Sequence, residues 1–359
     1  MINLDAIQKS SRSQSENMVL QSVDSLQRQL KQSFNEAKNL NFPSSYKRVK
    51  NVIIGGLGGS RFPALIIKEL FKQELKLPVI INDDYFLPSS FVNKENLVIL
   101  SSYSGTTEEV IIMAKQALIK KAKITGITSG GEIADILRGK KFPVYIFNPI
   151  YNPSGQPRIG FGYAVGGLLG MLFKLGFLKI KEEDVAQAIE RLKTLSSHYQ
   201  ITIKKEKNLA KQLAFNLYEK YPYFIVSEFL TGWGNAIANQ INETAKNISG
   251  FRVIPELNHH LMEGLKHPQK IKEVLIFIFF FSKFYSESIQ KRFIITKEVV
   301  EKNNILTLWI ELKGKNKIEQ VFEAMALGSY TSMYLSFLYK ENPAAIPYVD
   351  YFKKRLKEI

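Results

Sequence analysis

The chain has 359 residues, of which 45% are hydrophobic and 23% charged, and its formal net charge is +16. This length favours two domains, and the composition is typical of a globular protein. Because the sequence contains no cysteine, it excludes disulfides, a thiol nucleophile and a thiolate metal site.

The apolar stretches are too short to form a membrane-spanning helix. The stretch that comes nearest, residues 274–281 (VLIFIFFF), has the length of a strand. The N-terminal residues contain no apolar signal-peptide core. We therefore expect a soluble, cytoplasmic protein with no membrane partner.

The positive charge is compatible with nucleic-acid binding, with anionic metabolites or simply with frequent use of lysine. Lysines are spread along the chain, and basic clusters such as residues 353–355 are short. No recognised nucleic-acid motif accompanies them. A solvated surface is the favoured interpretation, and no nucleic-acid partner is expected.

The first half of the chain alternates short apolar runs with helical patterns. Residues 13–40 are expected to be helical, because apolar residues recur there at three- and four-residue steps. Strands separated by helix-length segments then predict parallel βαβ units and a doubly wound α/β sheet. The expected strands are residues 52–54, 79–81, 97–100, 122–127 and 144–147.

Polar turns follow the first and third of these strands. Residues 55–60 read GGLGGS and residues 101–107 read SSYSGTT. Ligands bind beyond the carboxyl ends of parallel strands, and a helix N-terminus attracts anions, so a small phosphate ester is the expected ligand. For either turn alone, an ordinary helix cap is the alternative. The first turn matches a dinucleotide fingerprint poorly, because Arg61 stands where a third glycine or alanine is needed.

The second half repeats the alternation, with strands expected at residues 223–226, 274–281 and 306–312. Arg158, just before an apolar helix, is a candidate anion clamp, and for a lone arginine an ordinary surface position is the favoured alternative. A duplicated α/β architecture is therefore predicted. Its expected parts are an N-terminal helical segment (1–42), a first domain (43–178), a helical linker (179–207) and a second domain ending in a basic helix (208–359).

Several motifs together resemble the sugar isomerase (SIS) family, and more closely the archaeal-type bifunctional phosphoglucose/phosphomannose isomerases. They are GGLGGS at 55–60, SSYSGTTEE at 101–109, PR at 157–158, NETAK at 242–246, PELNHH at 255–260 and a proline-containing tail at 343–357. The resemblance implies two SIS-type doubly wound parallel-sheet domains in tandem. It also implies an enzyme that interconverts glucose 6-phosphate and fructose 6-phosphate, with no cofactor or metal.

The resemblance also assigns roles to individual residues. Arg158 would steady the negative charge that develops on the substrate oxygens. The sugar 6-phosphate would be bound by Gly59, Ser60, Ser102, Ser104 and Thr107.

Catalysis would require a carboxylate that moves a proton between C1 and C2 through a cis-enediolate, and the resemblance places Glu243 there. Opening of the sugar ring would use His259, donated to the partner's site in a homodimer. It would also use Lys353, with Lys354 as a one-residue alternative.

The chain departs from the family pattern at three places. Relatives commonly continue the histidine motif as Asn-His-Asn-Glu, whereas residues 258–261 read NHHL. Arg61 stands where relatives usually have a small residue. Residues 342–347 lack the threonine that the family links to acceptance of the mannose epimer, so activity on mannose 6-phosphate stays open.

Two other functions are alternatives to the isomerase. One is a non-catalytic SIS-fold sensor that binds a phosphosugar. The other is a glutamine-dependent glucosamine 6-phosphate synthase, which the absence of any cysteine disfavours.

Overall fold

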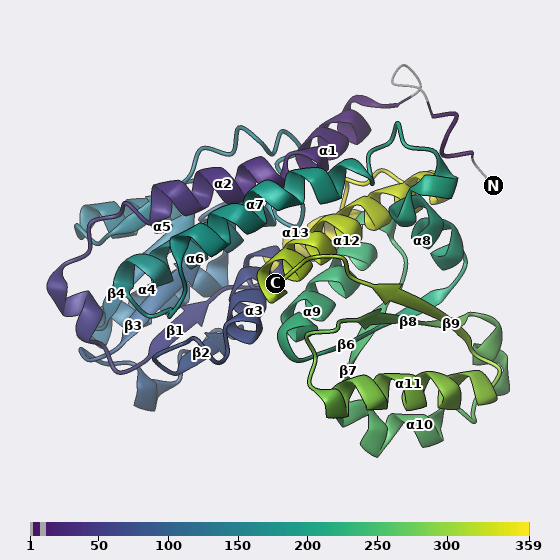
Figure 1. Ribbon diagram of the computed structural model, residues 1–359. Helices are drawn as coiled ribbons and strands as arrows, with labels where there is room; N and C mark the ends of the chain where they lie inside the picture. Colours follow the sequence, from purple (N-terminus) through teal and green to yellow (C-terminus); the bar gives the residue numbers. More distant parts are fainter. Residues whose placement is uncertain (1–2, 8–11, 359) are drawn as a thin grey trace.

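The computed structural model describes residues 3–7 and 12–358. These residues form two parallel sheets, each flanked by helices, with a bundle of long helices running along both (Figure 1). The α/β fold with two parallel sheets predicted from the sequence is confirmed. None of the described helices has both the length and the apolar composition needed to cross a bilayer.

The first sheet has strand order β2-β1-β3-β4-β5, and all its neighbouring strands are parallel. The connection that leaves β1 runs to β2, whereas the one that leaves β3 runs to β4 on the other side. A ligand crevice is therefore expected between the carboxyl ends of β1 and β3. The five predicted strands are all present: β1 (Val52–Gly55), β2 (Val79–Asn82), β3 (Leu97–Ser101), β4 (Lys123–Thr128) and β5 (Val144–Ile146).

The second sheet has strand order β7-β6-β8-β9, again with parallel neighbours. Its strands are β6 (Tyr221–Ser227), β7 (Gly250–Ile254), β8 (Leu275–Phe281) and β9 (Leu306–Glu311). Strand β7 lies outside the predicted elements. It is an edge strand that is mostly half-buried, and its sequence, GFRVI, lacks the continuous apolar run of the buried strand β8.

The helices cover these sheets and fill the space between them (Figure 1). Helix α8 and the four-residue helix α10 lie outside the predicted elements, whereas the other α-helices follow predicted segments. The α-helices of the described residues are α1 (Gln14–Asp24), α2 (Leu26–Ala37), α3 (Phe62–Leu70), α4 (Glu108–Ile119), α5 (Gly131–Gly139), α6 (Phe161–Leu175), α7 (Glu182–Ser197), α8 (Leu209–Leu217), α9 (Thr231–Gln240), α10 (Leu261–Gly264), α11 (Glu287–Lys302), α12 (Lys317–Tyr339) and α13 (Pro347–Leu356).

The predicted N-terminal helical segment is present as two consecutive helices, α1 and α2, which meet at Ser25. The N–H of Ser25 donates to the Ser22 carbonyl in a tight turn, and the side-chain amide of Gln29 donates to the same carbonyl at 3.0 Å. Because these two donors occupy the Ser22 carbonyl, the regular α-helical pattern is interrupted there.

Helix α12 is the central helix of the core. Every residue from Glu319 to Leu338 is buried, as expected for a helix that is apolar on most of its faces. It packs against α7, α8 and α9, so it joins α7 to helices on the side of the second sheet.

Helices α3 and α9 form a close contact between the two halves (Figure 1). A Cβ atom added at Gly232 of α9 would lie 2.2 Å from the Leu65 carbonyl oxygen of α3. Only glycine, which has no Cβ atom, allows the α9 backbone to approach the α3 backbone this closely. Because α3 follows the turn at 55–60 and α9 leads into residues 241–245, this contact brings those two segments together.

We expect Gly232→Ala to lower the free energy of unfolding by about 1–3 kcal/mol, because the added methyl group must push α3 and α9 apart. Gly139→Ala is the matched control, since a Cβ atom there meets nothing within 4 Å. Urea unfolding of both variants measures the difference. Equal stability of the two variants would contradict the proposed tight contact.

Candidate active site

The guanidinium of Arg158 is buried, with 1% side-chain exposure, and it joins distant parts of the chain. Its Nη2 donates to the carbonyl oxygens of Pro343, at 2.6 Å, and Ala344, at 3.0 Å. Its Nη1 donates to Gln156 Oε1 at 2.8 Å. A buried charge requires such partners, and the beginning of the C-terminal tail supplies two of them.

The other partners of Arg158 come from the second half of the chain. Nε donates to Thr244 Oγ1 at 3.2 Å, and Nη1 lies 3.4 Å from Glu243 Oε2. Burial lowers the pKa of the Arg158 guanidinium, and the negative charge of Glu243 partly opposes this shift. A carboxylate and an arginine that are 85 residues apart in sequence therefore form one ion pair.

Glu243 lies on a turn of unusual geometry. The sequence pattern predicts a helix over residues 235–245, but the α-helix ends at Gln240 and residues Ile241–Ala245 form a π-helical turn. Such turns are rare and occur frequently at functional sites. The Glu243 side chain is 31% exposed, so it contacts Arg158 and still remains accessible.

The serine- and threonine-rich turn follows β3 as predicted. Ser102 Oγ lies 2.8 Å from Thr107 Oγ1 and accepts a hydrogen bond from the Gly105 N–H at 3.1 Å. Ser104 Oγ lies 2.9 Å from Thr106 Oγ1. Thr107 is the N-cap residue of α4, but its side chain makes no capping hydrogen bond. The turn therefore presents hydroxyl groups and uncapped helix N–H groups, which together suit an anion.

The first glycine-rich turn, residues 55–60, contacts both the serine-rich turn and Arg158. Ser60 Oγ accepts a hydrogen bond from the Tyr103 N–H at 2.9 Å, and the Ser60 carbonyl accepts one from Ser101 Oγ at 2.8 Å. A Cβ atom added at Gly59 would lie 3.0 Å from the Arg158 backbone nitrogen. The two turns and Arg158, which is paired with Glu243, therefore adjoin one another at the carboxyl ends of β1 and β3.

A cavity of about 270 Å³ lies beside this group, between the first turn and the face of α9 that leads to Glu243. The ion pair between Arg61 Nε and Asp83 Oδ2, 2.7 Å apart, forms part of its wall. The full lining is Leu57, Gly58, Arg61, Phe62, Asp83, Asn235, Asn239 and Glu243.

Comparison with known proteins identifies the family of the chain. A family profile described as "Bacterial phospho-glucose isomerase C-terminal SIS domain" matches residues 206–356. A bifunctional phosphoglucose/phosphomannose isomerase of Caldicellulosiruptor bescii is 31% identical over 351 residues, which cover 95% of this chain and 99% of the relative. The chain belongs to the bifunctional phosphoglucose/phosphomannose isomerase family.

Other relatives extend this result. A bifunctional phosphoglucose/phosphomannose isomerase of Aquifex aeolicus is 24% identical over 311 residues, which cover 86% of this chain and 91% of the relative. The crystal structure of tagatose-6-phosphate ketose/aldose isomerase from Escherichia coli has a TM-score of 0.70 at 12% identity and covers 94% of this chain and 96% of that one. At this identity the likeness shows the fold alone. The predicted family, SIS-type fold and isomerase class are confirmed.

Two site residues predicted from the resemblance to this isomerase family are exposed and, among the described residues, make no hydrogen bond or ion pair with the site around Arg158. His259 is exposed at the end of the short turn Glu256–His259 that follows β7. Lys353 is exposed on α13, beside Lys354.

Other residues of the site had no role predicted for them. Gln240 is buried and donates from Nε2 to the Arg158 carbonyl at 2.7 Å. Thr244 and Lys246 belong to the NETAK motif that marks the isomerase family, which was a signal for both. Gln156 lies two residues before Arg158, but nothing in its sequence context indicated a contact.

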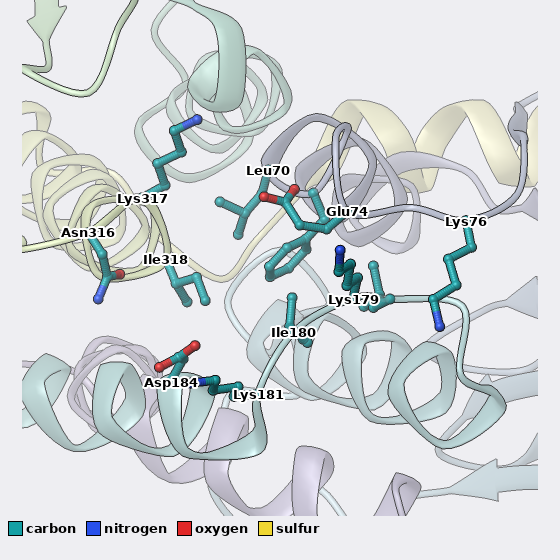
Figure 2. A pocket seen from close by; sticks show the side chains of 12 residues that line it. Leu70, Glu74, Lys76, Lys179, Ile180, Lys181, Asp184, Asn316, Lys317 and Ile318 are labelled. Carbon is teal, nitrogen blue, oxygen red and sulfur yellow. The ribbon is translucent and has the colours of Figure 1, made fainter.

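A larger cavity, of about 770 Å³, lies elsewhere, between the end of α3, residues 178–181 and the start of α12. None of the site residues predicted from the resemblance to the isomerase family lines this larger cavity. Figure 2 shows Lys317 and Lys76 on opposite sides of this cavity, with amino groups that do not converge. We therefore place the candidate active site at Glu243 and Arg158.

Lys246 is a second cation held close to the site. Its amino group donates to the carbonyl oxygens of Glu243, at 3.2 Å, Thr244, at 3.3 Å, and Asn342. Burial lowers the pKa of Lys246 to about 8, and the positive charge of Arg158 acts in the same direction. Its charged form is therefore less stable in the folded protein than in the unfolded chain.

This shift predicts a pH-dependent contribution to stability. Between about pH 8 and pH 10.5, the unfolded chain holds a proton on Lys246 that the folded protein has lost. Stability rises with pH wherever the unfolded state binds more protons. The wild type should therefore gain stability relative to Lys246→Met as the pH rises through this window. Urea unfolding at several pH values measures the gain.

Lys140→Met is the control for this measurement, because Lys140 is exposed at the end of α5. Its stability relative to the wild type should stay constant over the same pH range. Parallel pH profiles for the wild type and Lys246→Met would contradict the prediction.

Proposed function

We propose that this chain interconverts glucose 6-phosphate and fructose 6-phosphate, with Glu243 moving the proton between C1 and C2. The names of the relatives support the substrate class. The observation that carries the mechanism is the accessible Glu243 carboxylate, 3.4 Å from a buried arginine. That arginine adjoins the first glycine-rich turn, which is hydrogen-bonded to the serine-rich turn. Such a carboxylate can accept a proton from carbon while the arginine stabilises the charge that forms.

The phosphate group of the substrate would bind the hydroxyl groups of Ser102, Ser104 and Thr107, all in the proposed first domain, residues 43–178. The N-terminus of α4 would add its N–H groups. From there the open-chain sugar would extend past Gly59 and Ser60 toward Glu243. This places the phosphate at one end of the site and the reacting carbons at the other.

In the reaction of the aldose, the Glu243 carboxylate removes the proton from C2. The C2–H electron pair forms a C1–C2 double bond, and the carbonyl π electrons move to O1, which gives a cis-enediolate. Arg158 stabilises the negative charge on its oxygens. Return of the proton to C1, with O2 losing and O1 gaining a proton, gives the ketose. The reaction is balanced without an external oxidant or reductant.

We further propose a homodimer in which His259 of one subunit reaches the site of its partner, where it would assist ring opening with Lys353. The exposed positions of both side chains are consistent with this arrangement. No residue of helix α13 is buried, although the helix carries several large apolar side chains. A cluster of exposed apolar side chains of this kind often marks a surface that contacts another protein chain. The exposed large side chains of α13 are Tyr348, Val349, Tyr351, Phe352 and Leu356.

Glu243→Gln should lower kcat on fructose 6-phosphate by about 10²- to 10⁴-fold, because an amide cannot accept the carbon-bound proton. Formation of glucose 6-phosphate is followed with a coupled dehydrogenase, and mannose 6-phosphate is assayed in parallel to decide the second activity. Glu287→Gln, on the exposed surface of α11, is the matched control. If the wild type binds but does not convert either sugar, the chain is a phosphosugar-binding sensor.

Mixing Glu243→Gln with His259→Ala subunits tests the shared site. If His259 acts in the partner's site, each mixed dimer contains one intact site, so random mixing restores about a quarter of the wild-type activity. If His259 acts within its own subunit, neither site of the mixed dimer is intact. No recovery of activity after exchange of subunits would therefore disprove the donation.

A further inference from the structure

We propose that the 270 Å³ cavity beside Glu243 is a subsite for the hydroxyl groups of the substrate, and that Arg61 determines its specificity. This inference rests on the proposed function, because it assigns the sugar end of the same substrate. It adds a recognition element outside the phosphate-binding turn and the Glu243–Arg158 pair.

One wall of the cavity is a row of polar side chains. Asn235, Asn239 and Glu243 line it and follow one another at intervals of four residues along α9 and the π-helical turn. Residues four apart lie on the same face of a helix. The two amides therefore lead directly to the proposed catalytic carboxylate, and each can both donate and accept hydrogen bonds.

The opposite wall holds a guanidinium that is paired with a carboxylate. Arg61 Nε lies 2.7 Å from Asp83 Oδ2, at the carboxyl end of β2. Among the described residues, none accepts a hydrogen bond from the two terminal nitrogens of Arg61. A guanidinium has five N–H donors in a rigid fork, so the contact with Asp83 leaves several donors available to a ligand.

The charges in the cavity favour hydroxyl groups over a second phosphate. Arg61, the one cationic side chain of the lining, is paired with Asp83, and Glu243 is paired with Arg158 behind the wall. The lining therefore offers no unpaired cation that would attract a second phosphate. Sugar hydroxyl groups both donate and accept hydrogen bonds, so they match a wall of amides, carboxylates and a guanidinium.

The size and position of the cavity also fit one end of a longer ligand. Pockets that hold a whole small molecule usually measure about 300–1,000 Å³, and this cavity is slightly smaller, at about 270 Å³. Gly58 lines it, while Ser60, two residues later, is hydrogen-bonded to the serine-rich turn through Tyr103. A single turn therefore connects the phosphate-binding end with this subsite.

The test compares two ligands by calorimetry on the full chain. Glucitol 6-phosphate has a six-carbon chain but cannot isomerise, and glycerol 3-phosphate has the phosphate with only a short polyol. Arg61→Met should weaken binding of glucitol 6-phosphate by about 10- to 100-fold, as expected for loss of hydrogen bonds from a charged group. Binding of glycerol 3-phosphate should stay within twofold of the wild type.

Arg138→Met, on the exposed surface of α5, is the matched control and should change neither affinity. Should Arg61→Met fail to fold, Arg61→Lys keeps the charge but loses the fork, and should show the same selective loss to a smaller degree. Asp83→Asn, which weakens the anchor of Arg61, should act in the same direction.

An unchanged affinity for glucitol 6-phosphate in Arg61→Met would overturn the subsite, and so would an equal loss for both ligands. A wild type that binds no glucitol 6-phosphate would overturn it as well. Because these measurements require no turnover, they are separate from the proposed reaction. A wild type that binds the hexitol with the expected dependence on Arg61, yet converts no sugar, contradicts the isomerase mechanism and leaves the subsite standing.

Discussion

The buried positive charge of Arg158 is the constraint on which the candidate site depends. Removing a guanidinium from water costs several kcal/mol unless partners replace the lost hydration. Here the partners come from Gln156, from residues 243–244 and from the carbonyl oxygens of residues 343–344. The first half, the π-helical turn and the C-terminal tail are thus held together by one side chain. The same contacts that satisfy the charge also position Glu243, so stability and the proposed chemistry have a common origin.

The packing of α3 on α9 determines the separation between the first glycine-rich turn and the π-helical turn that carries Glu243. The absence of a side chain at Gly232 lets α9 touch the α3 backbone at Leu65, and the turn at 55–60 and the turn at 241–245 are then neighbours. The cavity containing Arg61 lies between these same two segments. A change in helix separation would therefore alter the Arg158 contacts and the proposed sugar subsite together.

Much of the fold could be predicted from the sequence, because its signals are local. The buried run of β3 and the serine-rich turn after it are contiguous, and both are found where the pattern placed them. Strand β7 escaped prediction because it is a mostly half-buried edge strand with a mixed pattern. The partners of Arg158 could not be foreseen, since two of them are backbone carbonyls of the tail, which leave no trace in residue type. In the sequence, Arg61 departs from both the dinucleotide fingerprint and the family pattern, but neither departure predicts its ion pair with Asp83, which depends on how β2 ends beside the first turn.

The tail contacts of Arg158 also bear on how the protein is made. Pro343 is synthesised 185 residues after Arg158, and at usual elongation rates that interval is roughly 10 to 40 s. During this time the strands of the first sheet are already complete. Glu243 is added 85 residues after Arg158, but the two carbonyl partners come only with the tail. Burial of Arg158 before that point would leave the Nη2 donors without acceptors. The order of synthesis therefore favours assembly of the complete site only after the tail has been made.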